Sequence, residues 1–319
     1  MTAPVALADR RPLGTSDLQV AELCLGDNVF GWTADEPASF AVLDAYAAAG
    51  GNFIDTADAY SHWIPGNEGG ESEAIIGKWM ASRGNRDSMI IATKVAKLPT
   101  AAGLSPANIR AAADASLERL QTDRIDLYYA HEDDTSVPFE ESLAAFDNLV
   151  KEGKVRYIAA SNFTADRLTE ALDVSAASGL ASFVALQNHY NLMERNDYEQ
   201  DLRPVVAARG LASLPYYGLA RGFLTGKYRQ GLTVDSARAG GVAQYVNERG
   251  ERVLAIVDAI AEQHSTTPAA VALAWLVAQP TVTCALASAR TLEQLDGLLA
   301  MTAVRLTEQN LTDLAAASS

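Results

Sequence analysis

Eight short apolar segments recur along this chain, and they restrict its fold more than any other feature. Most of them are apolar at nearly every position, not only at every second one. Near-continuous apolar character is typical of strands that are covered on both faces, as in parallel sheets. The segments are 22–26, 52–56, 89–94, 126–131, 155–161, 183–188, 211–216 and 282–288.

Segments with helical patterns separate these strands. Ser105, followed by Pro106, predicts the start of one helix, and Thr164 can cap another. Apolar residues at helical spacing over 139–150 stop before Gly153, which is a common signal at a helix C-terminus. Strand and helix alternate about eight times without a linker-like change in composition. We therefore expect residues 1–319 to form a single α/β domain, a (β/α)8 TIM barrel.

Two segments fall outside the repeat. Residues 11–23, RPLGTSDLQVAEL, alternate around a Gly-Thr-Ser-Asp turn and predict a short N-terminal β-hairpin before the barrel. Residues 222–245 are Gly-rich and polar, and they follow the seventh predicted strand. Connections of this length usually act as lids or binding loops.

The charge of the chain excludes several classes of partner. A net charge of -15 opposes general binding to nucleic acid or to an anionic membrane surface, so an anionic ligand needs a local cluster of Lys and Arg. The first residues lack the apolar core of a signal peptide, and no run of about 18 apolar residues occurs. We therefore expect a cytoplasmic protein with no membrane span.

Cysteine and histidine give no sign of a metal site. Cys24 and Cys284 lie in apolar, strand-like segments, which favours buried reduced thiols over a disulfide or a nucleophile. The four histidines show neither HExxH nor paired Cys spacing, so we expect no metal.

Polar side chains gather at the ends of the predicted strands, which is where the active site of such a barrel lies. Taken singly, Asp55 suits a helix cap, Lys94 a solvent-exposed side chain and His131 an interior histidine. Together they place an acid, a base and an imidazole on neighbouring strand ends, with the phenol of Tyr60 one turn beyond Asp55. The full set is Asp55, Lys94, His131, Ser161, Asn162, Gln187, Asn188, Tyr216 and Ser288.

Seven motifs in order along the chain resemble those of the aldo-keto reductases. They are FIDTADAY, IIATK, DLYYAH, KEGKVRYIAASNF, ALQNHYN, PYYGLARGFLTGKY and SARTLEQL, which lie between Phe53 and Leu295, and the resemblance covers the chain from Arg11 to about residue 300. The resemblance implies a nicotinamide-dependent enzyme that reduces a small-molecule aldehyde or ketone to an alcohol.

By this resemblance Asp55, Tyr60, Lys94 and His131 form the catalytic tetrad. Their chemistry agrees with that assignment. A phenol is a poor acid at neutral pH, and a nearby ammonium such as Lys94 favours release of its proton. Asp55 would hold Lys94, His131 would orient the substrate carbonyl, and Tyr60 would be the proton donor.

The resemblance also implies the cofactor and substrate contacts. A guanidinium near the adenosine end suits a 2′-phosphate, so we expect NADPH. The implied cofactor-binding residues are Ser161, Asn162, Gln187, Tyr216, Leu219, Ala220, Gly222, Lys227, Arg290 and Gln294. The aromatic residues expected at the substrate pocket are Trp32, His62 and Trp63, and the alternative for Trp63 is that it only holds its own loop in place.

Some residues depart from the family pattern. Gly297 and Leu298 stand where many relatives have a Glu-Asn pair that contacts adenine, so the strictness of NADPH over NADH stays open. Asp27 stands where a small or neutral residue is usual, and it introduces a carboxylate near the expected nicotinamide position.

Two other functions compete with reduction. A Schiff-base aldolase would use Lys94 as its nucleophile, although an adjacent Asp55 would raise rather than lower the pKa of that lysine. An NADPH-binding, redox-sensing subunit with little turnover would use the same barrel. The sequence leaves the oligomeric state and the physiological substrate open.

Overall fold

Eight parallel strands form the barrel in a computed structural model that describes residues 6, 7, 9–229, 231 and 239–319. Their order around the sheet is β10-β3-β4-β5-β6-β7-β8-β9, and backbone hydrogen bonds between Ser213 and the 281–283 segment join its two ends. The strands are β3 (Leu23–Gly26), β4 (Phe53–Asp55), β5 (Ile90–Val95), β6 (Ile125–Ala130), β7 (Val155–Ser161), β8 (Phe183–Gln187), β9 (Ala212–Ser213) and β10 (Ala285–Ala287). The predicted (β/α)8 barrel is confirmed.

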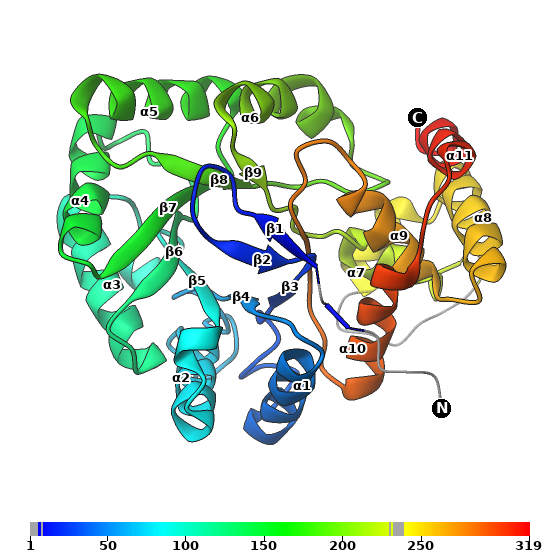
Figure 1. The fold of residues 1–319 in the computed structure, drawn as a ribbon, viewed down its shortest axis with the longest axis horizontal. Coiled ribbons are helices and arrows are strands. Elements are labelled where there is room, and N and C mark those ends of the chain that lie inside the picture. Colours follow the sequence, from blue (N-terminus) through cyan, green and yellow to red (C-terminus); the bar gives the residue numbers. More distant parts are fainter. Residues whose placement is uncertain (1–5, 8, 230, 232–238) are drawn as a thin grey trace.

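Helices surround this barrel, with α1 to α6 following one another around it in Figure 1. Near the C-terminus, α8 and α11 pack against each other on the outside. The helices are α1 (Glu36–Ala48), α2 (Glu71–Arg83), α3 (Pro106–Leu120), α4 (Phe139–Lys151), α5 (Ala165–Ser178), α6 (Arg203–Arg209), α7 (Ala239–Val242), α8 (Glu248–Gln263), α9 (Pro268–Val277), α10 (Leu292–Leu299) and α11 (Glu308–Ala317).

The predicted helix boundaries agree with the structure. The Ser105 hydroxyl accepts from the Asn108 N–H at the start of α3, and Thr164 does the same for Arg167 at the start of α5. Gly153 has a φ of 75°, a left-handed conformation that glycine adopts without strain, and it lies just beyond the end of α4.

The N-terminal hairpin is also confirmed, and it covers one end of the barrel. Strands β1 (Arg10–Pro12) and β2 (Gln19–Ala21) pair antiparallel. Leu13, Leu18 and Val20 are buried in the same apolar cluster as the barrel interior. The turn presses closely on β8, since a Cβ at Gly14 would lie 2.1 Å from the Val184 carbonyl oxygen. The C-terminal ends of the strands are left to form the site.

The seventh barrel strand is shorter than the predicted 211–216. Hydrogen bonds to β8 continue past β9, from the Leu214 N–H to the Leu186 oxygen and from the Tyr216 N–H to the Asn188 oxygen, both 2.9 Å. Between these two residues, the backbone of Pro215 faces the strand on the other side, β10, and a proline has no N–H to donate. Pairing toward β10 therefore ends early, while Tyr216 still reaches the strand-end rim.

Three further sequence expectations concern the rest of the chain. Cys24 and Cys284 are free and buried. In the described residues, no helix combines the length and apolar character needed to cross a membrane. Of the expected lid or binding loop at 222–245, residues 230 and 232–238 lie outside the described residues. The start of this predicted loop belongs to the 3-10 helix η4 (Ala220–Thr225).

Candidate active site

Lys94 is the centre of a buried polar cluster at the strand ends. It lies on β5 with its side chain fully buried, and its ammonium group forms an ion pair with Asp55 at the end of β4. The same Nζ donates to the Thr56 carbonyl oxygen at 2.7 Å and to the Tyr60 Oη at 3.0 Å. Each of its three N–H bonds therefore has an acceptor, which compensates for burying the charge.

Tyr60 is held over this ion pair by the loop that follows β4. Its hydroxyl donates to the Asp55 Oδ1 at 3.4 Å, and Lys94 Nζ lies 4.8 Å from its ring centroid. The next residue, Ser61, is buried with a φ of 70°, which is uncommon for a residue with a Cβ. The Ser61 hydroxyl donates to the Phe30 carbonyl oxygen at 2.8 Å. This contact fixes the Tyr60 loop against the loop after β3.

Gln187 reaches the same cluster from β8. Its Nε2 donates to the Asp55 Oδ2 at 2.8 Å. The two carboxylate oxygens of Asp55 thus have separate partners, Lys94 on one and Gln187 on the other. The sequence assigned Gln187 to the cofactor and gave no signal of this contact, which spans 132 positions.

His131 lies beside Tyr60 at the end of β6, with the two ring centroids 6.2 Å apart. Its Nδ1 is buried and has no hydrogen-bond partner in the structure. Burial, followed by the charges of Lys94 and Lys97, lowers the pKa of His131 well below its usual range. At neutral pH the imidazole is therefore uncharged, and it can donate one hydrogen bond to a substrate oxygen.

Tyr60 and Lys94 both keep their protons at neutral pH. Burial raises the pKa of Tyr60 above its ordinary value, and Lys94 offsets only part of that effect. Burial alone would lower the pKa of Lys94, but Asp55 and Tyr60 outweigh it and raise that pKa. At neutral pH the cluster contains a neutral phenol next to a charged ammonium, so Tyr60 can act as an acid.

A cleft of about 960 Å³ opens above this cluster. Asp55 and Lys94 lie beneath it, and Ala220 is buried away from it. The sequence-predicted residues that line it are Trp32, Tyr60, His62, Trp63, His131, Ser161, Asn162, Gln187, Tyr216, Leu219, Gly222, Lys227, Arg290 and Gln294. Sequence reasoning missed Asn28, Lys97, Tyr217, Arg221 and Thr291, which also line it.

A connected set of polar side chains lies along the β7 to β9 side of the cleft. Tyr216 stacks on His189 with ring centroids 5.4 Å apart and planes 7° apart. Its hydroxyl donates to the Asn162 Oδ1 at 2.8 Å, and the Asn162 Nδ2 donates to the Ser161 Oγ at 3.0 Å. These contacts give a rigid aromatic ring and amide groups at one wall, which suits a flat heteroaromatic amide such as nicotinamide.

Positive charge is concentrated in the cleft although the chain is acidic. Four cationic side chains line it, namely Lys97, Arg221, Lys227 and Arg290. Glu293 is the acidic residue that lines the same cleft. Arg290 precedes α10, which has Thr291 as its N-cap, and its backbone N–H donates to the Gln294 Oε1 at 2.9 Å. Cations beside a helix N-terminus favour phosphate groups. The residues present therefore fit a phosphorylated dinucleotide.

Asp27 does not face the cleft. Its side chain is fully buried, and neither carboxyl oxygen has a hydrogen-bond partner in the structure. Its backbone N–H donates to the Asp55 carbonyl oxygen at 2.9 Å. Burial, and then the charge of Asp55, raises the pKa of Asp27 well above its usual range, which opposes ionisation of the carboxyl group. The side chain of Asp27 is outside the cleft lining, so it does not place a carboxylate in the wall where the nicotinamide is expected.

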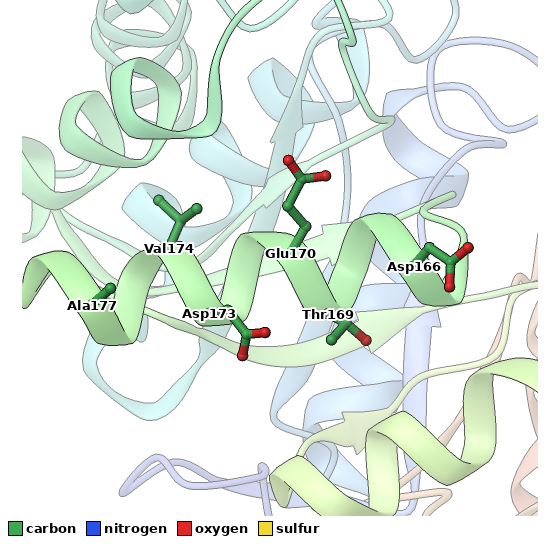
Figure 2. A pocket seen from close by; sticks show the side chains of 6 residues that line it. All are labelled: Asp166, Thr169, Glu170, Asp173, Val174 and Ala177. Atoms are coloured by element: carbon green, nitrogen blue, oxygen red, sulfur yellow. The ribbon is translucent and has the colours of Figure 1, made fainter.

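A second hollow lies along α5, away from the strand ends, and it has an acidic lining (Figure 2). Glu170 is paired with Arg167, and Asp173 is paired with Arg209. In the described part of the chain, no group of three or more His, Cys, Asp or Glu side chains is placed to hold a metal ion. The buried ammonium, the phenol and the imidazole lie instead at the cleft over Lys94.

Comparison with known proteins agrees with this geometry. Residues 22–319 match the model of the aldo/keto reductase family. The chain belongs to this family. An uncharacterized oxidoreductase, YrpG, of Bacillus subtilis is 34% identical, covering 89% of this chain and 87% of the relative. The protein tas of Escherichia coli is 33% identical (94% and 95%), and the norsolorinic acid reductase B of Aspergillus parasiticus is 31% identical (97% and 84%).

The family and the names of these relatives support an oxidoreductase that acts on a small-molecule carbonyl compound.

Proposed function

We propose that this protein is an NADPH-dependent reductase of aldehydes or ketones in which Tyr60 donates the proton. One observation carries the proposal. The Lys94 ammonium lies 3.0 Å from the Tyr60 hydroxyl, and Tyr60 and His131 both line the same cleft. A buried cation, a phenol and a neutral imidazole next to a large cleft are suited to protonating a carbonyl oxygen.

The bound nicotinamide would supply a hydride to the carbonyl carbon of the substrate. His131 would donate a hydrogen bond to the carbonyl oxygen and orient it. Tyr60 would transfer its proton to that oxygen, becoming a phenolate beside Lys94. The ammonium would stabilise the negative charge as it forms, while Asp55 and Gln187 would keep Lys94 in place.

The remaining cleft residues would hold the cofactor. Ser161, Asn162 and Gln187 would contact the carboxamide, and Tyr216 would stack on the ring. Leu219, Gly222 and Lys227 would surround the pyrophosphate, together with Arg221. Ala220 would contribute only through its backbone, since its side chain is buried. Arg290 and Gln294, at the start of α10, would meet the adenosine end, where a guanidinium suits the 2′-phosphate of NADPH.

The cluster is poorly suited to a Schiff-base aldolase. Such an enzyme needs a neutral lysine amine at neutral pH. Here Asp55 and Tyr60 raise the pKa of Lys94, and the group is fully buried beneath the cleft. The redox-sensing alternative shares every cofactor contact, so it is separated from the reductase only by turnover.

The first experiment is a titration of the purified protein with NADPH and with NADH, followed by intrinsic tryptophan fluorescence. An aromatic aldehyde is then added, and the absorbance of the reduced nicotinamide is recorded. We expect tighter binding of NADPH and aldehyde-dependent oxidation. Tight NADPH binding without turnover on any aldehyde would favour the redox-sensing subunit, and absence of binding to either nucleotide would overturn the reductase proposal.

A further inference from the structure

Lys97 is a cation of the cleft that the proposed cofactor contacts leave unused. It follows β5, three positions after Lys94, and lines the cleft. The other cations in the lining, Arg221, Lys227 and Arg290, come from segments after β9 and β10. In the strand order of the barrel, β5 lies four places from β9 and three from β10. Lys97 is therefore on the opposite side of the barrel from the cations assigned to phosphate.

The backbone conformation of Ala96 fixes the position of the Lys97 main chain. Ala96 has a φ of 112°, a conformation that residues with a Cβ rarely adopt. Its carbonyl oxygen accepts from the Gly103 N–H at 2.9 Å, and Ala96 pairs with Ala102 in an isolated bridge. The segment after β5 is thus turned sharply and held by a second backbone contact. Lys97 and His131 both line the cleft, so an anion held by Lys97 would share the cleft with the proposed carbonyl position.

The ion pair between Glu132 and Lys97 is exposed and weak. The two side chains form an ion pair of 3.3 Å, with 38% of Lys97 and 45% of Glu132 exposed. Exposed pairs of this kind contribute about 0.2–1 kcal/mol. Glu132 is outside the cleft lining, so Lys97 can exchange this weak partner for an anion that enters the cleft.

Two tryptophans form an aromatic wall on the same side of the cleft as Lys97. Trp32 and Trp63, from the loops after β3 and β4, contact edge to face with centroids 5.6 Å apart. Trp63 also contacts His62 at 5.4 Å and Tyr60 at 6.5 Å, and it is 43% exposed. Strands β3, β4 and β5 are neighbours, so the aromatic wall and the lysine share one side of the cleft.

We propose that Lys97 recognises an anionic group on the substrate, and that the substrates are aromatic aldehydes or ketones that carry a carboxylate. The carbonyl would lie at Tyr60 and His131, the ring against Trp32 and Trp63, and the carboxylate at Lys97. This inference rests on the proposed reductase function and adds the substrate class to it.

The test compares substrates that differ only in charge. The kcat/KM for 3- and 4-formylbenzoate is measured with NADPH, beside the values for their uncharged methyl esters. We expect the wild-type protein to prefer the acids about tenfold, which corresponds to roughly one charge-assisted hydrogen bond. Lys97→Gln should lower kcat/KM for the acids by about that factor and leave the esters within about twofold. Glu132→Gln should increase the preference, because it removes the competing partner.

Lys78→Gln is the matched control. Lys78 forms an exposed pair with Glu36 at 2.7 Å, away from the cleft lining, and the substitution changes the net charge by the same amount. It should leave the preference unchanged. A second readout avoids turnover, because binding of 4-(hydroxymethyl)benzoate with NADP+ can be followed by tryptophan fluorescence. This binding should weaken about tenfold in Lys97→Gln.

The outcomes separate the two proposals. If acids and esters are reduced with a ratio that Lys97→Gln does not change, the anion site is overturned and the reductase stands. If no aldehyde is reduced by the wild-type protein, both proposals are overturned.

Discussion

Gln187 on β8 donates a hydrogen bond of 2.8 Å to Asp55 on β4, across the barrel. This contact joins the wall proposed for the nicotinamide to the acid that holds Lys94. Asp55 is fully buried, so its second oxygen depends on Gln187 for a partner. If Gln187 binds the carboxamide as proposed, cofactor binding and the orientation of the Lys94 ammonium are coupled through one side chain.

Gln187→Leu should consequently damage catalysis as well as cofactor binding. It leaves one oxygen of a buried carboxylate without a partner, a loss of about 1.5–3 kcal/mol for a hydrogen bond to a charged group. We expect kcat to fall about 10- to 100-fold even at saturating NADPH. Gln187→Glu is not a conservative control, because it places a second carboxyl group against Asp55. A variant with normal kcat and a raised KM for NADPH would show that Gln187 acts on the cofactor alone.

Tyr60→Phe tests the proton donor directly. The substitution removes the hydroxyl that receives the Lys94 hydrogen bond and keeps the ring beside His131 and Trp63. We expect kcat for aldehyde reduction to fall about 10²- to 10⁴-fold, the usual contribution of a general acid. The NADPH dissociation constant, measured by fluorescence, should change less than about threefold. Near-normal turnover would remove Tyr60 from the proposed mechanism.

The sequence predicted which side chains meet at the strand ends better than it predicted the rest of the cleft. Strand ends converge in a barrel, so the order of the strands is enough to place Asp55, Lys94 and His131 together. Loop conformation has no such rule. Arg221, with a φ of 59°, stacks on Tyr217 and lines the cleft, while its neighbour Ala220 is buried. Only tertiary contacts decide which of these two residues lines the cleft.

The sequence gives no signal for the orientation of Asp27. It follows the last residue of β3, where the alternation of side chains along a strand no longer decides direction, and successive residues such as Ser161 and Asn162 both line the cleft. Gly26 lines it and Asp27 does not. Long-range partners such as Gln187 and Asp55 leave no local pattern, because only the closed barrel brings their side chains together.

Arg290→Ala tests the assignment of the adenosine end. If its guanidinium binds the 2′-phosphate, the loss should fall on NADPH and spare NADH. We expect the NADPH dissociation constant to rise about 10-fold or more, consistent with losing a charge-assisted contact, and that of NADH to change less than about twofold. Both constants are measured by fluorescence titration at fixed ionic strength. Equal losses for the two nucleotides would contradict phosphate recognition by Arg290.

The buried carboxyl group of Asp58 should make the stability of the protein depend on pH close to neutrality. It lies between Asp55 and Tyr60, it is 1% exposed, and neither carboxyl oxygen has a hydrogen-bond partner in the structure. Burial, and then the nearby charge of Glu73, raises the pKa of Asp58 to about 7. Below about pH 4, the folded and unfolded chains both hold this proton. Between about pH 4 and 7 only the folded chain holds it, so the free energy of unfolding decreases as the pH rises.

Urea unfolding of the wild type and of Asp58→Asn from pH 5 to 8 measures this effect, because other titrating groups cancel in the difference. The variant should gain stability relative to the wild type up to about pH 7, by at most about 1.4 kcal/mol per pH unit, and the gain should then level off. Asp87→Asn is the control of opposite sign. The hydrogen bond from Arg124 lowers the pKa of Asp87, so its loss should not stabilise the protein in this range. A constant difference between wild type and Asp58→Asn would mean that Asp58 is already ionised at pH 5.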